Sequence, residues 1–179
     1  MASPIAHSVS GYILGNILLL EQIKVPKHKK LRLHIYAIFV SIFADFDFIP
    51  QIITGERFHR GLTHSIFFTF IFSVIVSFLF SQYQHKPYKQ IFLFTLIIYA
   101  FHLLLDFFTA GGEGIQLLSP FTNTLFKSPI YIFPKVDHSS GFWAFSHIIT
   151  ISFEFTYSVL MLLGLSFWQR LRNLRRTKS

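Results

Sequence analysis

A histidine and an aspartate four residues apart lie inside one strongly apolar stretch. His102 and Asp106 occur in the run FHLLLDFF. Residues at i and i+4 share a face of a helix, so this imidazole and this carboxylate can bind one cation. Such ligands suit Zn²⁺ or Mn²⁺. The spacing alone also fits a simple hydrogen-bonded pair, so a metal site needs further ligands.

Two more carboxylates, Asp45 and Asp47, lie in another apolar run. Residues two apart do not share a face of a regular helix. Pro50 follows and favours a distorted helix end. Both carboxylates could then turn inward, or one could bind a metal while the other orients a histidine.

The segment 59–65, HRGLTHS, places two histidines and an arginine around a glycine. We expect His59 in a loop and His64 near the first turn of a helix, and either could be a ligand. A helix start beside Arg60 is also a natural anion site.

The composition indicates which elements position these residues. The chain has 179 residues, of which 52% are hydrophobic and 13% charged, with 24 Phe and no Cys. Its mean hydropathy is +0.51. A soluble domain of this size could not bury so much apolar surface. The absence of Cys excludes disulfides and thiolate ligands. We predict one all-α domain over residues 1–179, a polytopic membrane bundle of about five helices.

A membrane span needs roughly 20 mostly apolar residues. Four segments qualify: 33–52, 62–81, 91–108 and 145–168. A weaker segment, 5–22, predicts either a helix inside the bundle or one that is half inserted. The aromatic and proline-rich residues 117–134 suit a segment at the membrane interface.

With five spans, the 16 Lys and Arg residues fall twelve on one side and four on the other. The positive-inside rule then predicts a multi-pass membrane protein with a cytoplasmic C-terminus. We expect no nucleic-acid partner. Six of nine His and six of eight acids sort to the outer helix ends. They would form a metal site there or, less specifically, reach the headgroups. Glu154 lies deeper, either protonated, paired with Asn16 or His147, or supporting the site.

These blocks together resemble the YdjM-like family of bacterial inner-membrane proteins, described as metal-dependent hydrolases. The resemblance rests on His7 and on residues 44–50, 59–65 and 102–109, in that order. Ala44 stands where the family usually has proline. The resemblance implies a membrane-bound hydrolase with a metal site.

A more distant similarity is to zinc-dependent phospholipase C and P1-type nucleases, which are helical proteins with a zinc cluster. Residues matching part of that cluster occur in the same order: Asp45, His59, His102 and Asp106. The spacing of the last pair, His147 and Glu154, departs from their pattern. We therefore expect one or two metal ions here.

The leading hypothesis is a metal-dependent hydrolase of a phosphoester, with a membrane lipid as partner and a lipid phosphoester as the fitting substrate. The expected ligands of zinc, or of manganese, are His7, Asp45, His59, His64, His102 and Asp106. We assign Asp47 to orienting a ligand or to general-base catalysis, and Arg60 to holding the phosphate. One alternative is a non-enzymatic scaffold or regulatory interaction protein that metal stabilises. Another is a transporter of protons or metal ions, since intramembrane Asp and His also mark ion paths.

Overall fold

Helices make up nearly all of the regular structure in the described residues. The computed structural model describes residues 3–22, 27–55, 59–110, 113–134 and 145–176. The five long helices are α1 (Pro4–Gln22), α2 (Lys27–Ile42), α4 (Ile66–Gln84), α5 (Tyr88–Phe107) and α6 (Phe145–Arg176). Between α2 and α4 lie the 3₁₀ helix η1 (Phe43–Asp47), the short helix α3 (Phe48–Thr54) and the 3₁₀ turn η2 (Leu62–His64). Strand pairing within the described residues is limited to two isolated β-bridges. The all-α prediction is confirmed.

Four helical stretches are long and apolar enough to cross a membrane, by length and composition. They are Lys30–Thr54, Ile66–Gln84, Tyr88–Phe107 and Ile148–Arg175, which correspond to the four strong spans expected from the sequence. Large apolar side chains stand exposed on them, such as Ile75 and Phe78 on α4 and Phe155 on α6. An apolar outer surface is what a bilayer accommodates. Helix α1 is outside this set and packs against α2, α5 and α6, which favours the interior-helix alternative.

Helices α1 and α2 approach closely because small residues line their contact. Gly11 and Gly15, four apart on α1, face Ala37 and Ser41 on α2. A Cβ added to Gly11 would lie 2.4 Å from Ser41 Oγ and 2.9 Å from the Ala37 carbonyl oxygen. A Cβ on Gly15 would lie 3.0 Å from Ala37 Cβ. Small residues spaced by four are typical of tightly packed membrane helices.

The buried side of α4 carries polar side chains along its whole length. They are Thr69, Ser73, Ser77, Ser81 and Gln84. Most of the hydroxyls bond within the helix; Thr69 Oγ1, for example, donates to the Ser65 carbonyl oxygen at 2.8 Å. Such bonding is expected of small polar residues at a helix–helix contact in a membrane. These polar side chains therefore contribute to the packing of α4 against its neighbours. They also continue along the helix away from the predicted metal site.

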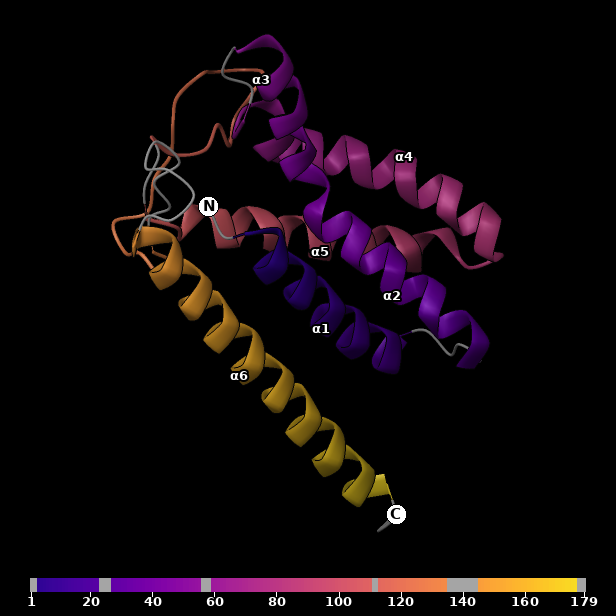
Figure 1. The fold of residues 1–179 in the computed structure, drawn as a ribbon. Helices are drawn as coiled ribbons and strands as arrows, with labels where there is room; N and C mark the ends of the chain where they lie inside the picture. The colour runs from indigo at the N-terminus through magenta and orange to yellow at the C-terminus, as the bar shows by residue number, and fades with distance from the viewer. Residues whose placement is uncertain (1–2, 23–26, 56–58, 111–112, 135–144, 177–179) are drawn as a thin grey trace.

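Five helix ends meet at one end of the bundle (Figure 1). These are the starts of α1, α4 and α6 and the ends of α2 and α5. Residues 113–134 lie over this end. The backbone N–H of Ile66 donates to the Leu117 carbonyl oxygen at 2.9 Å, and that of Ile132 donates to the Phe108 carbonyl oxygen at 2.8 Å. Phe121, in the middle of the segment, is 79% exposed. An ordered segment with outward apolar side chains suits the membrane interface.

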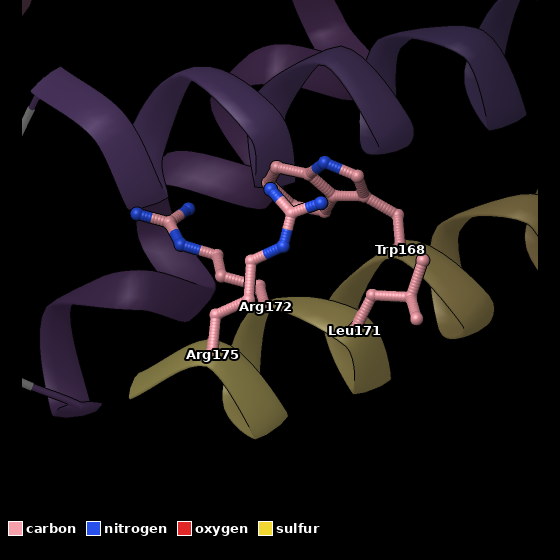
Figure 2. A pocket seen from close by; sticks show the side chains of 4 residues that line it. All are labelled: Trp168, Leu171, Arg172 and Arg175. Atoms are coloured by element: carbon pink, nitrogen blue, oxygen red, sulfur yellow. The ribbon is translucent and has the colours of Figure 1, made fainter. Parts of the chain in front are cut away.

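The C-terminal end of α6 has a different surface. A pocket of about 280 Å³ is lined there by Trp168, Leu171, Arg172 and Arg175. Figure 2 shows Trp168 and Arg172 projecting from the same side of α6. The Arg172 guanidinium carbon lies 5.3 Å from the Trp168 ring centroid. Trp and Arg at a helix end are typical interfacial anchors, as the positive-inside argument expects on the cytoplasmic side.

The orientation of the bundle can be tested with single cysteines, because the chain has none of its own. We expect a membrane-impermeant maleimide to label Asn123→Cys in intact cells and to leave Ser179→Cys unlabelled until the membrane is opened. Asn123 is exposed in the connecting segment, whereas Ser128 nearby is buried and would report poorly. The reverse labelling pattern would place the bundle's polar end in the cytoplasm.

Candidate metal centre

The two aspartates of 44–50 both turn inward because the helix changes type there. Helix α2 gives way at Phe43 to the 3₁₀ helix η1, within which both Asp45 and Asp47 are buried. Successive 3₁₀ residues are about 120° apart, so residues two apart diverge less than the ~160° of an α-helix. The distortion expected before Pro50 thus lets two carboxylates enter the bundle from one turn.

Asp47 holds the 59–64 loop. Its Oδ1 accepts from His59 Nδ1 at 2.7 Å, and its Oδ2 accepts from Thr63 Oγ1 at 2.6 Å. Oδ2 also accepts from the Arg60 backbone N–H and from His64 Nδ1, both at 3.1 Å. The Asp47 carboxylate already accepts four hydrogen bonds, so we assign it to orienting the imidazoles of His59 and His64 and not to binding the metal.

Two imidazoles and two carboxylates converge next to it. His64 Nε2 lies 3.2 Å from Asp106 Oδ2 and 3.9 Å from Asp45 Oδ1. His102 Nε2 lies 3.9 Å from Asp106 Oδ2 and 3.7 Å from Asp45 Oδ1. The two Nε2 atoms are 3.2 Å apart. The structure therefore brings together residues from η1, η2 and the end of α5.

The hydrogen bonds made by Nδ1 of His64 and of His102 determine whether the Nε2 atom of each ring is a donor or an acceptor. His102 Nδ1 donates to the Ser41 carbonyl oxygen at 2.7 Å, and His64 Nδ1 donates to Asp47. In a neutral imidazole the other nitrogen is then an acceptor. Two Nε2 lone pairs and two carboxylates thus face one another, an arrangement that is stable only with a proton or a metal cation among them.

Burial leaves further acceptors without hydrogen bonds among the described residues. Both Asp45 oxygens and His59 Nε2 are in this state. A buried carboxylate without donors is costly, and a metal ion is one of the few groups that compensates it.

The spacing of the acceptors also fits a metal ion. Four atoms about 2.0–2.2 Å from one ion in a tetrahedron lie about 3.3–3.6 Å from one another. The five separations measured among His64, His102, Asp45 and Asp106 run from 3.2 to 3.9 Å. The residues present therefore fit a divalent cation with nitrogen and oxygen ligands.

Ligand-type atoms also gather in two sets that share one residue. One set comprises His7, Asp45, His102 and Asp106, and the other Asp45, His59 and His64. Within each set the atoms lie within 4.8 Å of one another. His7 belongs to the first turn of α1; its Nε2 is 3.3 Å from Asp106 Oδ1, and its ring stacks on that of His102 at 3.8 Å. Asp45 thus lies where one or two ions could be held.

Arg60 reaches the same place with an unusual backbone. Its φ of 67° lies in the left-handed region, which non-glycine residues rarely adopt. Its N–H donates to Asp47, and its carbonyl oxygen accepts from the Gln116 N–H at 3.1 Å. The side chain is 7% exposed, and its Nε is 4.0 Å from Asp106 Oδ2. The cluster therefore combines a fixed cationic group with its acceptors.

The burial of the cluster removes the headgroup-contact alternative for these residues. His7, His64, His102 and Asp106 are all at most 2% exposed. Burial disfavours the charged form of His64, but the adjacent carboxylates of Asp106 and Asp47 outweigh that effect and raise the pKa of His64 to about 9. The carboxylates thus stabilise a cation at this position, either a proton on His64 or a metal ion that replaces it.

Glu154 has a partner that the sequence did not indicate. It is buried on α6 and accepts from the Ser3 backbone N–H at 2.7 Å and from the Ser3 hydroxyl. Ser3 Oγ in turn accepts from the Ile5 N–H at 3.1 Å, which caps α1. Asn16, one expected partner, donates instead to the Tyr12 carbonyl oxygen at 2.9 Å. The His147 side chain lies outside the described part. Glu154 thus holds Ser3 at the start of α1, and Ser3 lies four residues before His7.

Comparison with known proteins shows similarity to inner membrane proteins. No solved structure matches the chain. Inner membrane protein YbcI of Escherichia coli (strain K12) is 27% identical over 117 residues, which cover 63% of this chain and 67% of that protein. The profile described as YdjM inner membrane protein matches residues 1–174. With its apolar helices and its buried His/Asp cluster, the chain belongs to the YdjM family of inner membrane proteins.

Proposed function

We propose that the protein is a membrane-bound metal-dependent hydrolase that acts on a phosphoester. The observation that carries the proposal is the group of buried acceptors around Asp45, which no donor among the described residues satisfies. The ligand set contains only imidazole and carboxylate groups, which favours Zn²⁺, with Mn²⁺ as the second choice. Such an ion, when bound, lowers the pKa of its water and offsets charge on a phosphoryl oxygen.

The chain's own residues divide the remaining work. Asp45, Asp106, His64 and His102 would hold the ion, with His7 and His59 completing the two sets. Asp47 orients His59 and His64 and is a positioning residue, because its oxygens already accept four hydrogen bonds. Arg60 would hold a phosphate oxygen, a task for which a guanidinium with fixed direction is well suited.

The burial of the cluster supports a second candidate function, that of a metal-stabilised scaffold or regulatory protein. A metal ion bound by η1, η2, the start of α1 and the end of α5 would join these four segments even if the protein catalysed no reaction. Metal content alone does not separate the two candidates, because both need the ion. Turnover separates them.

The test is therefore hydrolysis by detergent-purified protein with added Zn²⁺ or Mn²⁺, over a panel of phospholipids, lipid pyrophosphates and nucleotides. We expect metal-dependent turnover of at least one phosphoester. His102→Ala and Asp106→Ala should abolish it while the protein still inserts into the membrane. Arg60→Ala should mainly raise KM, because it removes ground-state binding of the phosphate.

Two results would contradict the proposal. Activity that survives in the His102 and Asp106 variants would show that the cluster does not carry the reaction. A wild-type protein that binds metal but turns over nothing on the panel, with ligand variants that only lose stability, would favour the scaffold.

A further inference from the structure

A mostly apolar pocket adjoins the candidate metal centre. Its volume is about 390 Å³, and it lies where η1 and α3 meet η2 and the start of α4. Five of its lining residues are apolar: Phe43, Phe46, Pro50, Leu62 and Phe68. Pockets of this size with few polar groups are typical of small-molecule sites.

The two polar lining residues connect the pocket to the cluster. They are Asp47 and Thr63, which are bonded to each other at 2.6 Å. Asp47 also bonds His59, His64 and the backbone of Arg60. A molecule that fills the pocket therefore ends against the residues that hold the proposed ligands and the proposed phosphate clamp.

The pocket lies between two helical stretches that are apolar enough to cross a membrane. Its walls belong to two candidate membrane spans, Lys30–Thr54 and Ile66–Gln84, and to the turn between them. Exposed apolar side chains flank it on both sides: Ile49, Ile52 and Ile53 on α3, and Ile66, Phe67 and Phe70 on α4. An apolar surface of this kind around the pocket is one that the acyl chains of a bilayer can cover.

The other described pockets differ in chemistry. Those at the C-terminal part of α6 are lined by side chains such as Arg172 and Arg175, or Gln169 and Arg170. They lack acids and histidines among their lining residues. The pocket beside Asp47, by contrast, combines an apolar wall with a direct connection to the cluster.

We propose that this pocket holds one acyl chain of a membrane lipid phosphoester, with the phosphate directed toward Arg60 and the cluster. The inference rests on the proposed function and specifies its substrate class. A chain that moves from the bilayer into the pocket gains little from hydrophobic transfer, because the bilayer is equally apolar. The pocket acts by positioning, since it holds the headgroup in line with the reactive residues.

The pocket can be filled without changing a proposed ligand. Leu62→Trp puts a larger side chain into its wall, and Ile66→Trp is the matched control, because Ile66 is exposed nearby but does not line the pocket. We expect Leu62→Trp to lower kcat/KM for a long-chain phosphatidic acid by roughly tenfold to a hundredfold, as misplacement of a substrate does. Hydrolysis of 4-nitrophenyl phosphate, a phosphomonoester without acyl chains, should be unchanged in both variants, and bound metal should stay at the wild-type level.

Binding is measured separately with a phosphonate analogue of phosphatidic acid that carries a diazirine in one acyl chain. Its carbon–phosphorus bond resists phosphoester hydrolysis, so the readout does not need activity. After illumination, we expect adducts concentrated in residues 43–50 and 62–68 relative to Ile75, Phe78 and Leu79, which are exposed on α4. Leu62→Trp should remove this enrichment, and Ile66→Trp should keep it. A diazirine-labelled diacylglycerol, which lacks the phosphorus group, should show no enrichment.

The outcomes distinguish this proposal from the proposed function. Turnover of water-soluble phosphoesters, with no enrichment of adducts and no effect of chain length or of Leu62→Trp, would overturn the acyl pocket and leave the hydrolase intact. Enrichment in the pocket without any turnover would support the pocket and overturn the hydrolase. Equal labelling by the phosphonate and the diacylglycerol would show ordinary lipid contact and overturn the pocket.

Discussion

Replacing Asp45 with asparagine should remove metal from the whole cluster, not from one half of it. Asp45 is the residue that both ligand sets share. Its two oxygens are buried without a hydrogen bond among the described residues, so no protein donor depends on its charge. Asparagine keeps the shape of the side chain but removes the charge and one acceptor. We therefore expect loss of metal binding with little change in the fold.

The measurement is metal content per protein by elemental analysis after purification in detergent, followed by titration with Zn²⁺. Asp45→Asn should weaken binding more than the ~10–100-fold typical of losing a group that only supports a ligand. His7→Ala should cost less, because His7 belongs to one set only. His34→Ala is the control: this imidazole on α2 bonds the Lys30 carbonyl oxygen of its own helix, away from the cluster. Full metal content in Asp45→Asn would contradict the shared-ligand assignment.

The sequence predicts the gross fold well because the bilayer imposes long apolar segments. Each of the four strong spans corresponds to a described helical stretch of suitable length and composition. Alternating spans also place every second helix end together, which explains why residues as distant as Asp45, His64 and Asp106 can meet. That inference needs only the order of the helices and no knowledge of their packing.

The sequence does not predict which of Asp45 and Asp47 is a metal ligand and which orients the histidines. Both are acidic, both are buried, and they are two residues apart. Which one accepts donors from the 59–64 loop depends on how far the 3₁₀ turn rotates each carboxylate, and that rotation follows from the packing of η1 against η2. The hydrogen bond between Ser3 and Glu154 is similarly unpredictable, since the partners are 151 positions apart in the sequence.

Small uncharged residues also form regular patterns in the sequence. The hydroxyls of α4 recur every four residues from Thr69 to Ser81, and Gly11 and Gly15 are also four apart. Charged residues give the stronger signal in the sequence, because burying a charge in a membrane costs much free energy. Small residues matter for a different reason: they set how closely helices approach, which determines where the ends of those helices place their ligands.

Gly11→Ala should therefore detach α1 from α2 and disturb the centre through His7. The added Cβ would lie 2.4 Å from Ser41 Oγ, 2.5 Å from Ser41 Cβ and 2.9 Å from a backbone oxygen, so no small rotation of one side chain relieves the clash. Ser41 itself is constrained, because its carbonyl oxygen accepts from His102 Nδ1. Overpacking of this kind costs about 1–3 kcal/mol or more, against a gain of about 1 kcal/mol from replacing glycine in a helix.

Gly164→Ala on α6 separates these two effects. It makes the same substitution in a helix, but a Cβ there meets nothing within 4 Å. We expect Gly164→Ala to leave the midpoint of thermal unfolding in detergent unchanged or slightly higher, and Gly11→Ala to lower it and to weaken metal binding. The weakening should resemble that of His7→Ala, since both changes remove His7 from its set. Equal unfolding midpoints and equal metal affinity in the two alanine variants would mean that the close contact between α1 and α2 does not position His7.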